Sequence, residues 1–315
     1  LSGDGSVIAI GAGSNDGNGT SSGHVRIYKN NNGSWQQIGN DIDGEAKSDY
    51  LGNAISLSAD GSVIALGAAS NDGNGTSSGH VRIYKNNNGS WQQIGNDIDG
   101  EAKYDYFGQS VGLSADGSIV AIGAPYNKGK YIGSGHVRIY KNNNGSWQQI
   151  GSDIDGEAAS DYSGESISLS SDGSVVAIGA YMNDGNGSSS GHVRIYKNNN
   201  GSWQQIGSDI DGEAESDYSG QKISLSADGS VVAIGAYAND GNGSNSGHVR
   251  IYKNNNGSWQ QIGNDIDGEA SNDYLGQAVG LSSDGSIVAI GAPGNDDAAS
   301  SSGKVRIYRN VDSKW

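Results

Sequence analysis

The sequence reads NAISLSADGSVIALGA over residues 53–68. Apolar and small polar residues alternate over residues 53–58, a pattern typical of a strand with one buried face. Asp60 and Gly61 follow in an order that favours a tight hairpin turn, because glycine adopts positive φ at no steric cost. Residues 62–68 are apolar on both faces, so we expect a second strand that is buried on both sides. The stretch therefore predicts an antiparallel pair of strands.

A second pair of strands is predicted by HVRIYKNNNGSWQQIG at residues 80–95. Apolar and polar side chains alternate over residues 80–85, and NNNGS leads into a further strand at residues 91–95. The four strands recur as a unit, because the phrase LS-x-DGS returns every 56 residues. Its leucine stands at Leu1, Leu57, Leu113, Leu169, Leu225 and Leu281.

A repeat of this length with four antiparallel strands is typical of a β-propeller blade. We expect an all-β fold, a β-propeller of four-stranded antiparallel blades, in a single domain over residues 1–315. Six blades are represented. Because the sequence begins in the middle of a repeat, we expect an excerpt of a longer chain, in which a seventh blade can follow.

Composition narrows the classes of function. The 315 residues include 53 Gly, and a chain this rich in Gly, Ser and Asn is unlikely to form a helical bundle, because helices resist Gly. With 19 basic and 35 acidic residues the formal charge is −16, which disfavours nucleic acid or an anionic membrane as a partner. No segment approaches the roughly 20 apolar residues that a membrane-spanning helix needs. Such a surface favours cations.

One copy of the repeat carries a family resemblance. Residues 105–125 read DYFGQSVGLSADGSIVAIGAP, and residues 135–141 read GHVRIYK. This unit resembles the FG-GAP repeat of the integrin alpha-chain β-propeller, with its Phe-Gly at residues 107–108 and its Gly-Ala-Pro at residues 123–125. The resemblance implies seven blades. The calcium hairpin of that family lies between the first two strands, where this chain has only SADGS, so we expect Asp60 to be a turn residue.

The strongest chemical signal is an acidic loop between the fourth strand of one blade and the first strand of the next. It reads DIDGEAKSD at residues 41–49, with carboxylates at positions 1, 3, 5 and 9. Four carboxylates this close repel one another unless a cation lies among them, and the spacing is similar to that of Ca²⁺ ligands. Mg²⁺ fits less well, because it seldom accepts an all-protein cage. The glycine stands at position 4 rather than 6, which leaves open a solvated loop in which Asp and Gly make turns. The candidate ligands are Asp41, Asp43, Glu45, Asp49, Asp97, Asp99, Glu101, Asp105, Asp153, Asp155, Glu157, Asp161, Asp209, Asp211, Glu213, Asp217, Asp265, Asp267, Glu269 and Asp273.

The motif Asn-Gly-Ser/Thr recurs in two loops of the repeat and provides candidate sites of N-glycosylation. Asn-Gly is also the favoured tip of a hairpin, so the motif has a structural alternative. The candidate sites are Asn18, Asn32, Asn74, Asn88, Asn144, Asn186, Asn200, Asn242 and Asn256.

Tryptophan and histidine each mark one position of the repeat. The tryptophans, which open the fourth strand, either cover the neighbouring blade or stack on a sugar ring, and covering is the commoner role. They are Trp35, Trp91, Trp147, Trp203, Trp259 and Trp315. The histidines are His24, His80, His136, His192 and His248, and Lys304 replaces them in the last copy. Because His and Lys share no metal-ligand role, we expect a polar residue at a strand start.

The sequence contains no recognisable catalytic constellation. No Gly-x-Ser-x-Gly elbow lies between a strand and a helix, and no distinctive residue breaks the repeat to mark a single active site, so we expect no enzymatic activity. We expect a structural, adhesive propeller at the cell surface or outside the cell, stabilised by Ca²⁺ and glycosylated. Its partners would be protein or glycan ligands at a surface, or copies of itself in a filament. The alternative is a multivalent lectin with one weak sugar site per blade.

Overall fold

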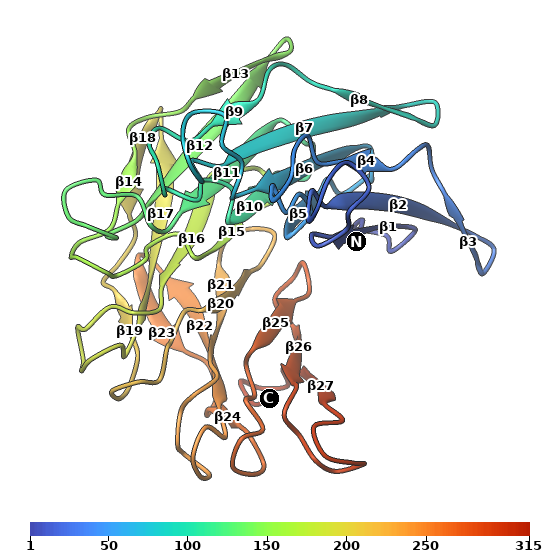
Figure 1. The fold of residues 1–315 in the computed structure, drawn as a ribbon. Helices are drawn as coiled ribbons and strands as arrows, with labels where there is room; N and C mark the ends of the chain where they lie inside the picture. Colours follow the sequence, from blue (N-terminus) through green and yellow to red (C-terminus); the bar gives the residue numbers. More distant parts are fainter. The chain divides into compact units, whose positions relative to one another are not determined.

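The computed structural model describes residues 1–315, and its regular elements are all β-strands. It contains no helix that is long and apolar enough to cross a membrane. The chain divides into two compact units, residues 1–155 with 171–173 and residues 156–170 with 174–315. Each unit contains three antiparallel sheets (Figure 1). These six sheets confirm the all-β prediction and the propeller blades, whereas the single domain stays a prediction.

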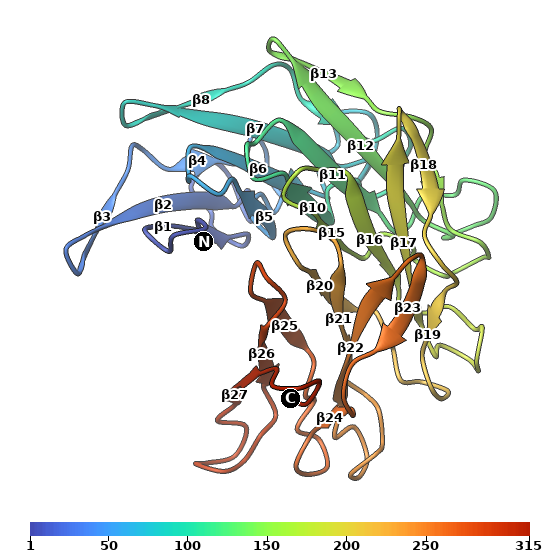
Figure 2. The same ribbon diagram turned by 180° about the vertical axis from the view of Figure 1, so that it is seen from behind.

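The first unit contains strands β1 to β14. The first sheet is formed by β1 (Val7–Ala12), β2 (His24–Asn31), β3 (Ser34–Gln37) and β4 (Ile42–Asp43). The second is formed by β5 (Ala54–Leu57), β6 (Val63–Ala68), β7 (His80–Asn87), β8 (Ser90–Gln93) and β9 (Ile98–Asp99). The third is formed by β10 (Ser110–Leu113), β11 (Ile119–Ala124), β12 (His136–Asn143), β13 (Ser146–Gln149) and β14 (Ile154–Asp155). In both views the hairpins β2–β3 and β7–β8 project from this unit (Figure 1, Figure 2).

The second unit contains strands β15 to β27 and repeats the same order. The fourth sheet is formed by β15 (Ser166–Leu169), β16 (Val175–Ala180), β17 (His192–Asn199), β18 (Ser202–Gln205) and β19 (Ile210–Asp211). The fifth is formed by β20 (Lys222–Leu225), β21 (Val231–Ala236), β22 (His248–Asn255), β23 (Ser258–Gln261) and β24 (Ile266–Asp267). The sixth is formed by β25 (Ala278–Leu281), β26 (Ile287–Ala292) and β27 (Lys304–Arg309).

The second sheet shows how closely the predicted strands agree with the structure. Strands β5 to β8 pair in chain order, and β6 is buried along its whole length as expected. The fourth strand differs, because it is broken into β8 and β9, which both pair with β7. Between these paired stretches, residues 82–83 of β7 face residues 94–97. The two extra residues form a bulge, which brings Asp97 at the start of the acidic loop to the edge of the sheet.

Neighbouring sheets pack face to face within each unit. The core between the second and third sheets includes Val81, Ile83, Phe107, Val120 and Ile122, all of them buried. Alternating β-branched residues supply this layer because they fit a pleated surface. The apolar residues that alternate in the sequence therefore form the core between neighbouring blades.

Backbone hydrogen bonds also join successive blades within each unit, at the turn before the second strand. The N–H of Gly3 donates to the carbonyl of Ala59 at 2.8 Å, and the N–H of Ala59 donates to the carbonyl of Ala115 at 2.9 Å. In the second unit the N–H of Ala227 donates to the carbonyl of Ser283 at 2.8 Å. Equal repeat lengths keep these turns at equal heights, so each turn meets the next.

The DGS turn is structural, as predicted. Gly61 has a φ of +70°, and its N–H donates to the carbonyl of Ser58 at 2.9 Å. The carboxylate of Asp60 accepts hydrogen bonds from the hydroxyl of Ser58 at 2.7 Å and from the N–H of Ser62 at 2.9 Å. The same bonds from serine hydroxyls and a backbone amide lower the pKa of Asp284 to about 2. The carboxylate of Asp60 is therefore bonded to groups of its own turn.

Candidate functional site

The structure separates the four carboxylates of each acidic loop. In the second loop, Asp97 accepts a hydrogen bond of 2.6 Å from the side-chain amide of Gln93 in the same blade. Asp99 ends β9 with an exposed side chain. Glu101 forms an ion pair with Arg138 of the next blade. The side chains of one loop therefore point to different partners instead of surrounding one ion.

The fourth carboxylate of the loop holds two blades together. Asp105 is 1% exposed, and its Oδ2 accepts hydrogen bonds from the N–H of Ala102 at 3.0 Å and from the amide of Asn127 at 2.9 Å. Asn127 belongs to the loop after β11 in the next blade. The same bond recurs between Asn183 and Asp161, Asn239 and Asp217, and Asn295 and Asp273. This part of the acidic pattern thus has a structural cause.

The displaced glycine of the loop also has a structural cause. The N–H of Gly100 donates to the carbonyl of Gly79 at 2.8 Å, so two segments of backbone cross there. A Cβ at this position would collide with the carbonyl of Ser78. Only glycine allows such an approach. Ca²⁺ binding by the loop stays a prediction.

Carboxylates from successive loops meet instead around a buried histidine. A Glu from one loop lies beside a His and an Asp of the next blade, and one ligand atom of each lies within 4.8 Å of the others. The sequence contains a signal for these groups, because each Glu precedes its His by 35 residues. That signal crosses from one repeat to the next, so it is missed when each loop is considered alone. The groups are Glu45–His80–Asp97, Glu101–His136–Asp153, Glu157–His192–Asp209 and Glu213–His248–Asp265.

Burial sets the charge of these histidines. Desolvation lowers the pKa of His80, His136 and His192 below its ordinary value, and it lowers the pKa of His248 to about 4. The neighbouring carboxylates act in the opposite direction but are outweighed. The imidazoles are therefore neutral at pH 7, and each has a nitrogen lone pair.

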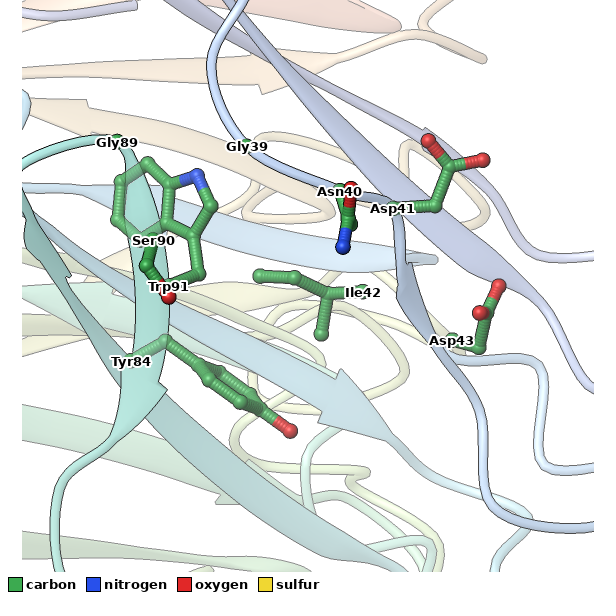
Figure 3. A pocket seen from close by; sticks show the side chains of 9 residues that line it. All are labelled: Gly39, Asn40, Asp41, Ile42, Asp43, Tyr84, Gly89, Ser90 and Trp91. Atoms are coloured by element: carbon green, nitrogen blue, oxygen red, sulfur yellow. The ribbon is translucent and has the colours of Figure 1, made fainter.

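A polar pocket recurs where the bulge of one blade faces the tryptophan of the next. The pocket between the first two blades has a volume of about 350 Å³. Figure 3 shows Trp91 and Tyr84 on one side of it, Ile42 near its centre, and Asn40 and Asp41 on the other side. Its equivalents have volumes of about 400 Å³ and about 340 Å³. They are lined by Asn96, Asp97, Ile98, Tyr140 and Trp147, and by Asn264, Asp265, Ile266, Lys314 and Trp315, among others.

The tryptophan that lines the pocket also clamps two blades. The indole N–H of Trp91 donates to the carbonyl of Ile38 in the preceding blade at 2.9 Å, and that of Trp147 donates to the carbonyl of Ile94 at 2.8 Å. Both rings pack against the core between their blades. The ring is thus fixed in place, while its remaining edge faces the pocket.

The candidate glycosylation sites fall into two structural groups. The side-chain amide of Asn74 donates to the carbonyl of Gly100 at 2.9 Å, and Asn18, Asn186 and Asn242 make the equivalent bond. The second group, Asn32, Asn88, Asn144, Asn200 and Asn256, is exposed at hairpin tips with a φ of 51° to 53°. All nine asparagines are exposed, but only in the first group is the side-chain amide bonded to a backbone carbonyl.

One loop departs from the repeat. Residues 125–134 read PYNKGKYIGS, where the preceding copy has ASNDGNGTSS. Ile132 is 73% exposed and Tyr131 is also exposed, with the ammonium of Lys130 over the Tyr131 ring at 5.1 Å from its centroid. This loop therefore differs from its counterparts in both sequence and exposed apolar surface.

The sheets and their order define a β-propeller protein. The FG-GAP repeat model matches residues 98–140 and 209–252, and each match runs into the third strand of a blade. The chain thus carries FG-GAP repeats, and these repeats form the blades, as the sequence resemblance predicted. A search of curated proteins finds no match.

Solved structures share the fold at low sequence identity. The periplasmic gluconolactonase of Pseudomonas aeruginosa is similar with a TM-score of 0.63 and 16% identity, over 99% of this chain and 80% of that chain. Hydrazine synthase of Kuenenia stuttgartiensis is similar with a TM-score of 0.59 and 12% identity, over 93% of this chain and 72% of that chain. At these identities the similarity shows the fold alone.

The similarity to the gluconolactonase corrects the expectation of no enzymatic activity. That protein is named as an enzyme and shares the fold over nearly the whole of this chain. The exclusion from sequence was wrong, because it required a nucleophile elbow beside a helix and an all-β propeller has no such element.

Proposed function

We propose that this protein is a multivalent adhesive module that acts outside the cytoplasm and binds glycans through the pockets between neighbouring blades. The observation that carries the proposal is the recurrence, in three places, of a pocket lined by an Asn-Asp-Ile segment of one blade and a tryptophan of the next. A repeat that presents equivalent pockets favours a ligand that is itself repetitive, such as a polysaccharide.

The lining fits the chemistry of a sugar. The indole of Trp91 offers an apolar edge, and the phenol of Tyr84 lies beside it. The amide of Asn40 is exposed and makes no hydrogen bond within the protein, so it is available to sugar hydroxyls. Its equivalents Asn96 and Asn264 are also exposed.

Avidity compensates for the small size of each pocket. A pocket of about 350 Å³ accommodates one or two sugar rings, and such contacts are individually weak. Several pockets on one chain raise the apparent affinity by a factor of about 10² or more when they bind one polymer together. The periplasmic location in the name of the gluconolactonase supports a site of action outside the cytoplasm. Calcium binding and glycosylation remain parts of this proposal.

A glycan array probed with the full chain, followed by calorimetry on the best glycan, tests the proposal. The variant Asn40→Ala/Asn96→Ala/Asn264→Ala should bind at least about tenfold more weakly, at an unchanged melting temperature. The matched control is Ser152→Ala/Ser208→Ala, at the positions where the other two loops carry serine. Equal affinity of the triple variant and the native chain would refute the pocket as the site.

A protein partner is the second candidate, favoured by the exposed loop at residues 125–134. Its apolar Ile132 and its lysines contrast with an acidic chain, so the acidic loops of another copy are a complementary surface. Sedimentation equilibrium of the native chain and of Ile132→Glu tests this interaction, which predicts association lost in the variant. Hydrolysis of gluconolactone, measured on the same samples, tests the enzymatic activity that the shared fold raises.

A further inference from the structure

We propose that the clusters Glu45–His80–Asp97 and Glu213–His248–Asp265 bind a first-row divalent transition-metal ion, of which Zn²⁺ is the representative. Each cluster joins two neighbouring blades, because its Glu comes from the loop of one blade and its His and Asp come from the next. The metal would therefore tie the blades together. Asp97 and Asp265 also line two of the pockets proposed for glycans, but the test of metal binding does not depend on glycan binding.

The spacing of the three groups suits such an ion. Nδ1 of His80 lies 3.6 Å from Oδ2 of Asp97. Nδ1 of His248 lies 3.8 Å from Oε2 of Glu213 and 3.9 Å from Oδ2 of Asp265. Ligands bound to one Zn²⁺ at about 2.1 Å in a tetrahedron are roughly 3.4 Å apart. The three ligand atoms of each cluster, all within 4.8 Å of one another, are therefore only slightly farther apart than the ligands of one ion.

The histidines themselves point to a missing ligand. His80 is 2% exposed and His248 is 1% exposed, and Nε2 of each is buried without a hydrogen-bond partner. Nδ1 faces the carboxylates at distances too long for a hydrogen bond. Nε2 lies across the ring from the carboxylates, whereas Nδ1, which has no partner at hydrogen-bond distance, faces the carboxylates with a lone pair that can bind an ion.

The last copy of the repeat carries a covalently attached cation next to the same glutamate. Lys304 stands where the other copies have histidine, and its Nζ lies 2.7 Å from Oε2 of Glu269 and 2.7 Å from Oδ2 of Asp297. Oε1 of Glu269 pairs with Arg306 instead. In the cluster of His248 the two carboxylate oxygens of Glu213 also have different neighbours. Oε1 lies near Arg250, and Oε2 faces the imidazole. The oxygen that holds an ammonium in one copy is thus open to a metal ion in the other.

The arginines explain why two of the four clusters are the better sites. Arg82 and Arg250 donate to the backbone carbonyls of Asp43 and Asp211, at 2.8 Å and 2.6 Å. Asp97 and Asp265, which belong to the same blades as these arginines, therefore face the histidines.

In the other two clusters the arginine competes with the ion. Arg138 donates to both carboxylate oxygens of Asp153 at 3.1 Å, and Nε of Arg194 lies 3.3 Å from Asp209. We therefore expect the clusters of His136 and His192 to bind more weakly.

The ligand set selects the class of metal. Imidazole nitrogen together with carboxylate oxygen suits Zn²⁺, Co²⁺ and Ni²⁺, whereas Ca²⁺ and Mg²⁺ prefer oxygen ligands alone. This site differs from the Ca²⁺ loop predicted from the sequence, because its ligands come from two loops and a strand.

The test uses the untagged full chain, stripped of metal by a chelator and titrated with Co²⁺ and Zn²⁺. We expect the visible absorption of protein-bound Co²⁺ with at least two equivalents, and a rise in melting temperature of about 5 °C with Zn²⁺ near a hundred times its dissociation constant. His80→Lys/His248→Lys copies the natural residue at position 304 and should abolish the two tighter sites. The control His24→Lys changes a histidine outside the four clusters and should leave Co²⁺ binding unchanged.

A second variant keeps the test decisive if the lysines disturb folding. Glu45→Gln/Glu213→Gln changes carboxylates that are about half exposed and should weaken Co²⁺ binding at least about tenfold. The proposal is overturned if native protein gives no Co²⁺ absorption, if both double variants retain it, or if Ca²⁺ raises the melting temperature and Zn²⁺ does not.

Discussion

Asp105→Ala separates the structural role of the acidic loop from a calcium-binding role. The substitution removes the acceptor of two hydrogen bonds, from the N–H of Ala102 and from the amide of Asn127, at a position that is 1% exposed. A buried donor without a partner costs about 1–3 kcal/mol. Only Asn127 is buried, whereas the N–H of the exposed Ala102 can bond to water instead, so the substitution should cost about 3 kcal/mol of unfolding free energy. In a unit of this size that corresponds to a melting temperature lower by about 10 °C.

Calorimetry with a chelator and again with excess Ca²⁺ measures this effect. We expect Asp105→Ala to lose the same stability in both conditions, because its partners are groups of the protein. The matched control is Asp99→Ala in the same loop, whose side chain is exposed and makes no hydrogen bond. That change should stay within about 0.5 kcal/mol.

A loss of stability seen only with Ca²⁺ would refute the reasoning. So would equal losses in Asp99→Ala and Asp105→Ala, because a shared cation is the one partner that makes the two carboxylates equivalent. In either case the loop would be a calcium site, as the spacing of its carboxylates predicts.

Three further predictions concern other positions of the repeat. Gly100→Ala places a Cβ against a backbone carbonyl and should lower the free energy of unfolding by about 3 kcal/mol or more, which urea denaturation would show as a lower midpoint. An unchanged midpoint would contradict the close approach of the two backbone segments at Gly100. Ser282→Ala should raise the pKa of Asp284 from about 2 toward its ordinary value, measured by NMR titration. Since a carboxyl with a lowered pKa loses its stabilising effect as pH falls toward that pKa, the variant should lose this contribution at a higher pH. In a eukaryotic secretory host, peptide mapping should find glycan at Asn88 but not at Asn74, whose amide is bonded to backbone; occupancy of both sites contradicts that division.

The strands were predictable because the residues that define each strand and turn lie close together within one repeat. Alternation over residues 53–58 and the turn at Asp60 and Gly61 give the inner hairpin, and both appear in the structure. The break of the fourth strand was not predicted. Its cause is the bulge at residues 94–97, which lie outside the paired register between β7 and the two parts of the fourth strand. A single strand carries no information about a bulge in its pairing.

The candidate sites were predictable only in part, because they lie between blades. The loop carboxylates were found as acidic residues, but their partners belong to the next repeat, as with Asp105 and Asn127. The tryptophans were placed correctly on the neighbouring blade, since Trp91 bonds the carbonyl of Ile38. The pocket beside Trp91 needs two blades and a bulge, so no single unit contains it.

The departure of one copy from the repeat proves more informative than the identity of the others. Because the copies are nearly identical, they amount to a single observation. Lys304 adds a second one, because it shows that the histidine position also accepts a lysine. From the sequence, lysine at a histidine position argued against a metal ligand. In the structure the ammonium of Lys304 lies between Glu269 and Asp297, so a cation occupies the space beside the glutamate in this copy. In the cluster of His248, Oε2 of Glu213 faces the imidazole at 3.8 Å instead of an ammonium, and this is the position at which we propose the metal ion.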